Sequence, residues 1–132
     1  MAQVDYLKRQ FDLFGRVLGK IIAMLLGIKT MEEKSAYTIT TEILLDKLHL
    51  NLNEIICFSN EDFLIALSKI DGFNSTNLEK LAEILLLLAN ENQISNLLYK
   101  KSLCIYEYLE DKDKSYSLVR QQKINMIRKQ LR

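Results

Sequence analysis

The chain has 132 residues, 48% of them hydrophobic and 27% charged, and a formal net charge of +1 at pH 7. A chain of this length and apolar content can bury a core without metal ions or disulfide cross-links. Its near-neutral charge argues against a strongly basic nucleic-acid-binding protein. Proline is absent. Since proline inside a helix costs roughly 3 kcal/mol, its absence favours a chain that is helical almost throughout.

The first predicted element is a long helix over about residues 3–26. Its apolar residues alternate in steps of three and four, which places them on one side of a helix. They are Val4, Leu7, Phe11, Phe14, Leu18, Ile21, Leu25 and Ile28. Gly27 is expected to end the helix in the left-handed conformation. Gly15 and Gly19 adjoin the apolar side, where they either let two backbones approach closely or only relax a long helix.

The end of this helix contains an apolar run, residues 21–28, between Lys20 and Lys29. Crossing a membrane takes about 20 apolar residues, so the run is too short for a span. Charged residues are spread through the helical period before it, rather than grouped ahead of it as in a secretory signal. We therefore expect a packed helix and not a leader peptide.

Capping pairs three residues apart mark the starts of the following helices. They are Thr30 with Glu33, Ser59 with Asp62, and Thr76 with Glu79. The helices predicted from these pairs cover about residues 30–48, 59–70 and 78–89. Residues 51–57 are expected to form a loop with a short helical turn.

The helix over residues 78–89 is apolar on nearly every side, so it is the expected centre of the domain. Two more helices follow, one over about residues 94–109 and one from the charged linker 110–113 to residue 131. Their expected inward residues are Ile94, Leu98, Ser102, Ile105, Leu109, Tyr116, Val119, Ile124, Ile127 and Leu131. No β-alternation of useful length occurs. The predicted fold class is therefore all-α, with about six helices in antiparallel hairpins within a single domain, 1–132.

The two helices over about residues 78–109 resemble a degenerate tetratricopeptide repeat. The matching segments are Leu81-Ala82-x-x-Leu85 for the first helix of the motif and Tyr99-x-x-Ser102-Leu103 for the second. The motif's initial Trp, loop Gly and terminal Pro are missing here. Alternation of small and large residues suits any helical hairpin, so the match supports the hairpin more than the family.

A broader similarity covers Tyr6 to Lys29 and Leu44 to Lys69. These segments look like a family of small uncharacterised bacterial proteins whose C-terminal helices are tetratricopeptide-like. The resemblance implies a tetratricopeptide-like (TPR-like) bundle or short superhelix with a long N-terminal helix, and it implies no catalytic site. Such folds usually act as binding scaffolds, so by analogy of fold alone the resemblance implies a protein-binding role.

The chain offers few residues for redox or metal chemistry. Cys57 and Cys104 lie in apolar surroundings, so we expect reduced, buried thiols in a cytosolic protein rather than a disulfide or redox pair. The only histidine, His49, shares a helix face with Glu42 and Asp46. Within this set, Asp46-x-x-His49 resembles one Glu-x-x-His unit of a di-iron bundle. Such a site needs a second unit and further carboxylates, so we expect no metal and a solvated acidic face.

Catalytic candidates are equally sparse. His49 lies at a helix end with no nucleophile elbow near it, and no glycine-rich phosphate-binding motif occurs. Glu79 and Glu83 lie four apart on the one polar strip of the helix 78–89, but Lys80 adjoins them and no converging group is identifiable. The sequence therefore predicts no enzyme, no catalytic residue and no cofactor.

Charge is unevenly distributed along the chain. Residues 30–99 carry eleven acids against four Lys or Arg, whereas residues 100–132 carry nine Lys or Arg against four acids. The last helix holds a basic strip, which consists of Arg120, Lys123, Arg128, Lys129 and Arg132. This basic strip either meets nucleic-acid phosphates or forms a solvated face that pairs with the acidic middle of the chain.

Four tyrosines near the C-terminal half leave two interpretations open. They are Tyr99, Tyr106, Tyr108 and Tyr116. Tyrosines of this kind either face outward at an interface or lie in the core with their hydroxyls reaching water.

Three classes of function follow from these features. The leading hypothesis is a non-enzymatic, cytoplasmic interaction module that binds a protein or peptide in a groove between helices. A homodimer through the long first helix is a related expectation. The alternative is a nucleic-acid-binding protein that uses the basic C-terminal helix, and the third class is an enzyme with carboxylates in a bundle cleft.

Overall fold

The computed structural model describes residues 2–27, 35–90, 95–113 and 117–131, and within these ranges it contains seven helices and no strand. The helices are α1 (Ala2–Gly27), α2 (Ala36–Leu48), α3 (Leu52–Ile55), α4 (Asn60–Ser68), α5 (Ser75–Ala89), α6 (Ser95–Lys112) and α7 (Leu118–Gln130). The predicted all-α class and the long N-terminal helix are confirmed. The seventh helix, α3, is the short helical turn expected within residues 51–57.

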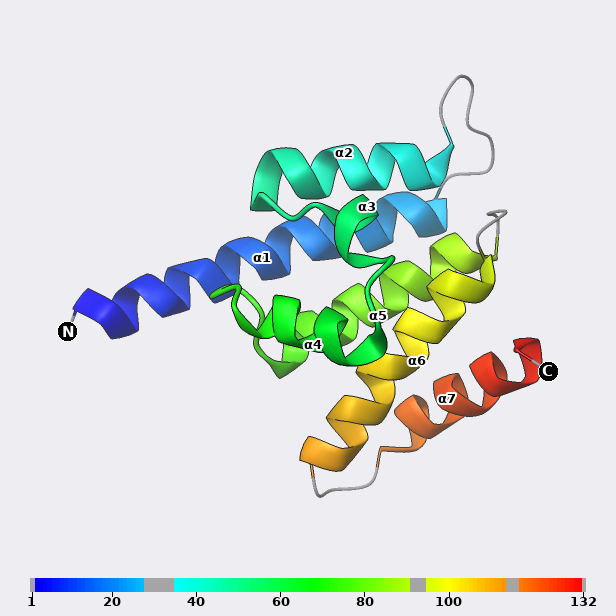
Figure 1. The fold of residues 1–132 in the computed structure, drawn as a ribbon. Helices are drawn as coiled ribbons and strands as arrows, with labels where there is room; N and C mark the ends of the chain where they lie inside the picture. Colours follow the sequence, from blue (N-terminus) through cyan, green and yellow to red (C-terminus); the bar gives the residue numbers. More distant parts are fainter. Residues whose placement is uncertain (1, 28–34, 91–94, 114–116, 132) are drawn as a thin grey trace.

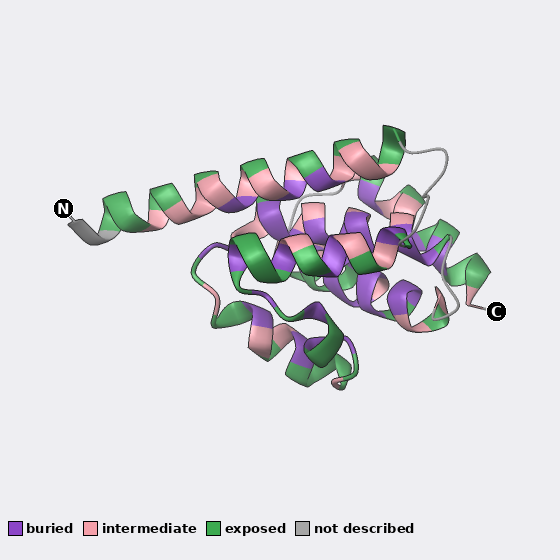
Figure 2. Ribbon diagram, turned by 90° about the horizontal axis from the view of Figure 1, so that it is seen from above, coloured by how far each residue is buried: buried purple, intermediate pink, exposed green. Residues whose placement is uncertain are grey.

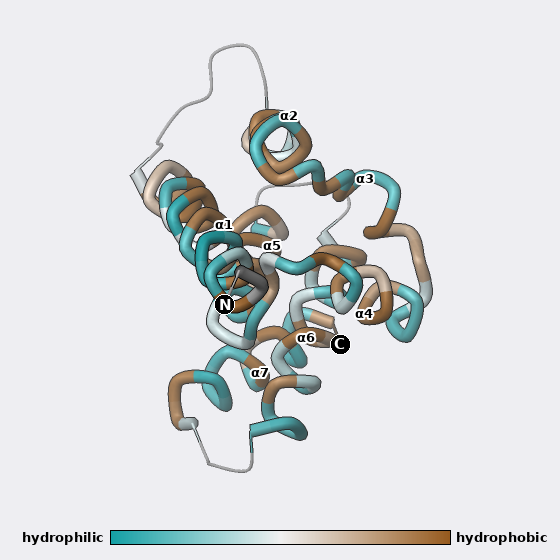
Figure 3. Tube along the Cα trace, turned by 90° about the vertical axis from the view of Figure 1, so that its left-hand side faces the viewer, coloured by the Kyte–Doolittle hydropathy of each residue, from teal (hydrophilic) through white to brown (hydrophobic). Residues whose placement is uncertain are grey.

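The helices are arranged around α5, which lies between α1 and α6 and makes its most extensive contacts with these two (Figure 1). Helix α2 packs on α1, and α7 packs along α6. Helices α3 and α4 connect α2 to the start of α5 and contact one another and, through α4, helix α6. Figure 3 looks roughly along α1 and α2 and shows α5 in the middle of the group.

Helix α5 is buried on nearly all sides, as its composition predicts. Its buried apolar residues are Leu78, Leu81, Ala82, Ile84, Leu85, Leu86, Leu88 and Ala89. It runs antiparallel to α6, and the two cross where Ser102 donates a hydrogen bond from its hydroxyl to the carbonyl oxygen of Ala82 at 2.7 Å. Both residues are fully buried. The small residues of the two matched segments therefore do lie at a helix crossing, where they let the backbones come close.

The apolar stripe of α1 is buried only along its middle. Phe14, Leu18 and Ile21 are in the core, whereas Val4 is 62% exposed. The first turns of α1 extend beyond the other helices (Figure 2). Ile28, the last residue of the predicted stripe, lies outside the described residues. The stripe is therefore longer than the surface that α2 and α5 offer to cover it.

Several predicted helix ends are displaced by a few residues. Helix α2 has Ser35 as its N-cap, and the predicted pair Thr30 and Glu33 lies outside the described residues. Helix α5 is capped by the Asn74 side chain rather than by Thr76, which lies in the first helical turn. Helix α6 continues to Lys112, so most of the expected linker 110–113 is helical. The Ser59 cap of α4 is confirmed, because its hydroxyl accepts from the backbone N–H of Asp62 at 3.1 Å.

The left-handed residue of this fold is not the one expected. Gly27 has no positive φ and ends α1 within the helix, whereas His49 has φ of 55° at the end of α2. The His49 N–H and the Leu50 N–H donate to the last carbonyl groups of α2, which satisfies backbone acceptors that a helix end leaves free. His49 therefore ends a helix and turns the chain toward α3.

Asn77 joins α1 to the turn that precedes α5. Its side chain is 2% exposed, and its amide nitrogen donates to the carbonyl oxygens of Phe11 at 3.0 Å and Gly72 at 2.8 Å. Gly72 is buried against the ring of Phe14, which in turn meets the Phe73 ring edge-on at 5.2 Å between centroids. A Cβ atom on Gly72 would overlap the Phe14 ring. This turn therefore requires glycine for space.

Gly15 and Gly19 differ in their surroundings, and a Cβ atom at either position would not meet the backbone of another helix within 4 Å. A Cβ atom on Gly15 would lie 3.3 Å from the Asn77 amide oxygen, whereas one on Gly19 would meet nothing within 4 Å. Only Gly15 lies at a close contact, and that contact is with side chains of α5.

We predict that two glycine substitutions change stability in opposite directions. Gly72→Ala should lower the free energy of unfolding by about 1–3 kcal/mol, because the added methyl group overpacks Phe14. Gly19→Ala should raise it by about 0.5–1 kcal/mol, because alanine is the better helix former and the site is open. Urea denaturation of both variants measures the change, and a Gly72→Ala protein as stable as the wild type would contradict the described packing.

Candidate functional site

An apolar groove lies beside α4, between that helix, the start of α5 and the end of α6. It encloses about 400 Å³. Its lining residues are Leu64, Ile65, Leu67, Ser68, Phe73, Leu78, Tyr108 and Lys112. We call this the α4–α6 groove. Ile65 is 44% exposed and Tyr108 is 39% exposed, so two large apolar surfaces face solvent at the groove.

The position of α4 explains why apolar residues remain uncovered there. Phe63 and Leu67 are four residues apart and fully buried, which fixes one side of α4 against the core. Leu64, Ile65 and Ser68 follow on the neighbouring side of the helix and line the groove. A nine-residue helix whose apolar residues cover more than one side cannot bury all of them against a single neighbour.

The α4–α6 groove also holds a cation. The Lys112 ammonium lies 5.9 Å from the centroid of the Tyr108 ring, one helical turn away, which is within the range of a cation–π interaction. Within the described part of the chain, no carboxylate lies within 4.0 Å of this ammonium. The groove therefore combines apolar walls with a positive charge that the described residues leave available.

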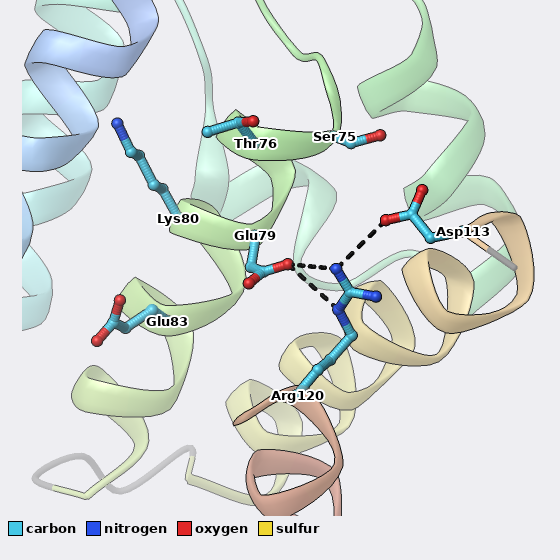
Figure 4. Close-up of a pocket in the computed structure, with 7 residues that line it drawn as sticks. All are labelled: Ser75, Thr76, Glu79, Lys80, Glu83, Asp113 and Arg120. Carbon is cyan, nitrogen blue, oxygen red and sulfur yellow. Dashed lines mark hydrogen bonds and ion pairs between the residues drawn. The ribbon is translucent and has the colours of Figure 1, made fainter. Parts of the chain in front are cut away.

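A second cleft lies between α5 and α7 and contains a cluster of charged residues around Arg120 (Figure 4). The Arg120 guanidinium donates to Glu79 at 2.7 and 3.2 Å, to Glu110 at 3.0 Å and to Asp113 at 3.3 Å. Gln121 also donates to Glu110, at 2.9 Å. We call these five residues the Arg120 cluster. Arginine suits this position because its planar fork supplies several N–H donors at once.

Burial and ion pairing shift the pKa of Arg120 in opposite directions, whereas burial and nearby charges both raise the pKa of Tyr106. Arg120 is 8% exposed. Burial would lower the pKa of Arg120, but the bonds to Glu79 and Glu110 raise it above its ordinary value. Burial also raises the pKa of Tyr106, and the negative charges of Glu83 and Glu79 raise it further. Arg120 is therefore held as a cation, and Tyr106 as a neutral phenol.

The basic strip of α7 is largely paired with acids of α5 and α6. Besides Arg120, Lys123 lies 3.9 Å from Glu83 and Arg128 lies 2.8 Å from Glu107. Lys129 is exposed, and Arg132 lies outside the described residues. The alternative of nucleic-acid binding stays a prediction, but three cations of the strip already have carboxylate partners within the chain.

The residues that the sequence suggests for catalysis or metal binding do not converge on one site. Glu79 points toward Arg120 and Glu83 points away from it, so the two glutamates do not converge (Figure 4). His49 serves as a helix end, and Asp46 lies 3.6 Å from Lys47. Over the ranges that the structure describes, no group of three His, Cys, Asp or Glu residues is placed to hold a metal ion.

The two cysteines differ in exposure, so the expectation of two buried thiols is wrong for one of them. Cys104 is buried and Cys57 is exposed, and both are free. Cys57 lies on the short segment after α3, where the Sγ atom bonds the carbonyl oxygen of Asn53 at 3.7 Å. The neighbouring Ile55 and Ile56 take the buried positions at this point of the chain.

Lys101 is a buried cation that the sequence pattern does not reveal. It is 4% exposed, and the ammonium donates to the Phe58 carbonyl oxygen at 2.6 Å and to the Asn60 side-chain oxygen at 2.9 Å. Burial lowers the pKa of Lys101. Phe58 lies in the segment that joins α3 to α4, and Asn60 is the first residue of α4, so Lys101 fastens the start of α4 to α6. The nearby Phe63 ring, 5.6 Å from the ammonium, covers it on another side.

The tyrosines divide between the two interpretations. Tyr99 and Tyr106 are buried, and the Tyr99 hydroxyl donates to Asn90 at 2.6 Å. Tyr108 is exposed at the α4–α6 groove. Tyr116 lies outside the described residues. Among the three described tyrosines of this set, Tyr108 is therefore the exposed one.

No protein-family model, curated protein or solved structure matches this chain. Among the helices that the structure describes, none combines the length and the apolar character that a membrane crossing requires.

We predict that Arg120 contributes far more to stability than Arg128. Arg120→Met keeps much of the aliphatic packing but leaves Glu79, Glu110 and Asp113 without their shared cation, so the free energy of unfolding should fall by about 2–3 kcal/mol. Arg128→Met removes one exposed pair with Glu107 and should cost less than about 1 kcal/mol. Urea unfolding curves of the two variants compare the losses, and equal losses would contradict the central role of Arg120.

Proposed function

We propose that this protein is a non-enzymatic helical interaction module that acts in the cytoplasm and binds a peptide segment of a partner protein in the α4–α6 groove. The observation that carries the proposal is the groove itself, in which Ile65 and Tyr108 expose apolar surface beside buried core residues. Exposed apolar surface that is concave and contiguous is typical of interaction sites.

The chemistry of the α4–α6 groove indicates what kind of segment it binds. Its walls are largely apolar and lie between helices, as in other complexes in which an amphipathic helix binds a groove. Lys112 at the groove favours a carboxylate on the bound segment. The proposed ligand is therefore a short amphipathic segment with an acidic residue next to its apolar side. As part of the same proposal, the chain is a member of the family of small bacterial proteins that it resembles, and it has no enzymatic activity.

Selection from a random peptide library displayed on phage tests this proposal with the full chain as bait. Enriched peptides are expected to combine apolar residues with Asp or Glu. Ile65→Glu should weaken their binding about tenfold or more, because it places a charge in the centre of the apolar contact. Lys112→Glu should weaken the acidic peptides selectively.

Val119→Glu is the matched control, because Val119 is 61% exposed on α7 and does not line the groove. It should leave peptide binding unchanged. Peptides that bind the Ile65→Glu protein as well as the wild type would show that the groove is not the binding site. A library with no enriched peptide would count against the function itself.

We also propose a homodimer through the N-terminal part of α1. Val4, which is 62% exposed, and Leu7 continue the heptad spacing of the buried stripe toward the N-terminus, where the first turns of α1 extend beyond the other helices (Figure 2). An apolar seam with steps of three and four is the pattern by which two helices pair.

Light scattering over micromolar concentrations tests the dimer. The wild type should give twice the monomer mass, and Leu7→Glu should give the monomer mass because it places a charge in the seam. Leu45→Glu, at an exposed position of α2, should remain dimeric. A monomeric wild type over the whole range would remove this proposal and leave the groove unaffected.

A further inference from the structure

The inner side of α7 has a compact and regular pattern. Arg120, Lys123 and Arg128 carry cations, and Ile124 and Ile127 lie between them along one side of the helix. Each of the three cations has a carboxylate partner on α5 or α6, and both isoleucines are buried. This helix is thus bound to the rest of the protein in the way that a basic amphipathic peptide binds an acidic surface.

The surface beneath α7 is complementary to this pattern. It combines carboxylates from two helices, which are Glu79 and Glu83 of α5 and Glu107, Glu110 and Asp113 at the end of α6. The carboxylates of Glu79, Glu110 and Asp113 all bond one guanidinium, so this part of the surface is shaped for arginine and not merely negative. We call this the α7-binding surface.

Helix α7 is held by fewer buried apolar residues than the central helices and by ion pairs that are partly exposed. Its fully buried apolar residues are Ile124 and Ile127, whereas Leu118, Val119 and Met126 are exposed. Helix α5, by contrast, buries eight apolar residues. The Lys123 and Arg128 pairs are partly exposed, and such pairs weaken as salt screens them. Helix α7 therefore opens at a lower cost in free energy than α5 or the part of α6 that packs on α5.

We propose that the α7-binding surface is a docking site for a basic amphipathic helix of a partner protein, and that α7 is its resident occupant, which the partner displaces. The partner helix would carry cations at positions i, i+3 and i+8 and apolar residues at i+4 and i+7, as α7 does. While α7 is bound, the fraction of molecules with a free surface is small, and the apparent affinity for the partner falls by that fraction. The contact of α7 is in this sense autoinhibitory.

A fluorescent peptide with the sequence of residues 117–132 serves as the probe. In the full chain, Ile124→Asp with Ile127→Asp removes the apolar anchors of α7 and frees the surface. This variant should bind the peptide about tenfold or more tightly than the wild type does. Adding Glu79→Gln and Glu110→Gln should reverse the gain, because the surface then lacks the carboxylates that hold arginine. Binding should also weaken as salt is raised.

Two controls distinguish the α7-binding surface from nonspecific attraction of a basic peptide and from the α4–α6 groove. A peptide in which glutamine replaces Arg120 should bind the freed surface at least about tenfold more weakly. Ile65→Glu, which disables the α4–α6 groove, should leave binding of the 117–132 peptide unchanged. Failure of the groove proposal and failure of this one are therefore distinguishable.

Hydrogen exchange of the wild type provides a measurement that needs no substitution. The amides of α7 should exchange faster as salt is raised, while those of α5 stay protected. Equal peptide affinity for the wild type and the freed variant would overturn the proposal. So would exchange in α7 that is as slow as in α5 at every salt concentration.

Discussion

Helix α5 has to be covered on almost every side, and the rest of the fold follows from that requirement. Eight of its apolar residues are buried, which takes neighbours on several sides at once: α1 on one, α6 on another. Fully buried Ala82 and Ser102 let α6 approach closely, and the Ser102 hydroxyl satisfies a backbone carbonyl that this approach removes from water. Asn77 does the same on the other side, where it bonds backbone oxygens of Phe11 and Gly72.

The surfaces that carry the proposed functions lie at the margins of this arrangement. The α4–α6 groove exists because α4 is short and buries only one side. The first turns of α1 stay uncovered because its apolar stripe is longer than the surface that α2 and α5 offer. The α7-binding surface exists because the polar strip of α5 still needs partners, and acids on α5 and α6 meet the cations of α7 there. In each case the surface consists of residues that the central packing around α5 does not cover.

Local sequence patterns predict the helices that matter most for the core. The three- and four-residue spacing of apolar residues identifies α1, and apolar residues on nearly every side identify α5 as the central helix. Sequence does not decide between two good caps: Asn74 and Thr76 both suit an N-cap, and Asn74 caps the helix that also carries the buried Asn77. The apolar spacing places Val119 inward, but Arg120 takes the inner position because it meets the carboxylates of Glu79 in α5, Glu110 in α6 and Asp113 directly after α6. The groove and Lys101 depend on contacts between distant segments, which no local pattern contains.

Lys101 has a consequence for how the molecule responds to its ionic surroundings. Its ammonium is held by uncharged oxygens inside the protein, and ion–dipole contacts of a buried group are little affected by dissolved ions. We therefore expect ionic strength to affect the Lys101 contacts between α6 and the start of α4 less than the partly exposed Lys123 and Arg128 ion pairs of α7. A change in salt concentration is thus expected to act on the proposed α7-binding surface more than on the Lys101 contacts at the start of α4.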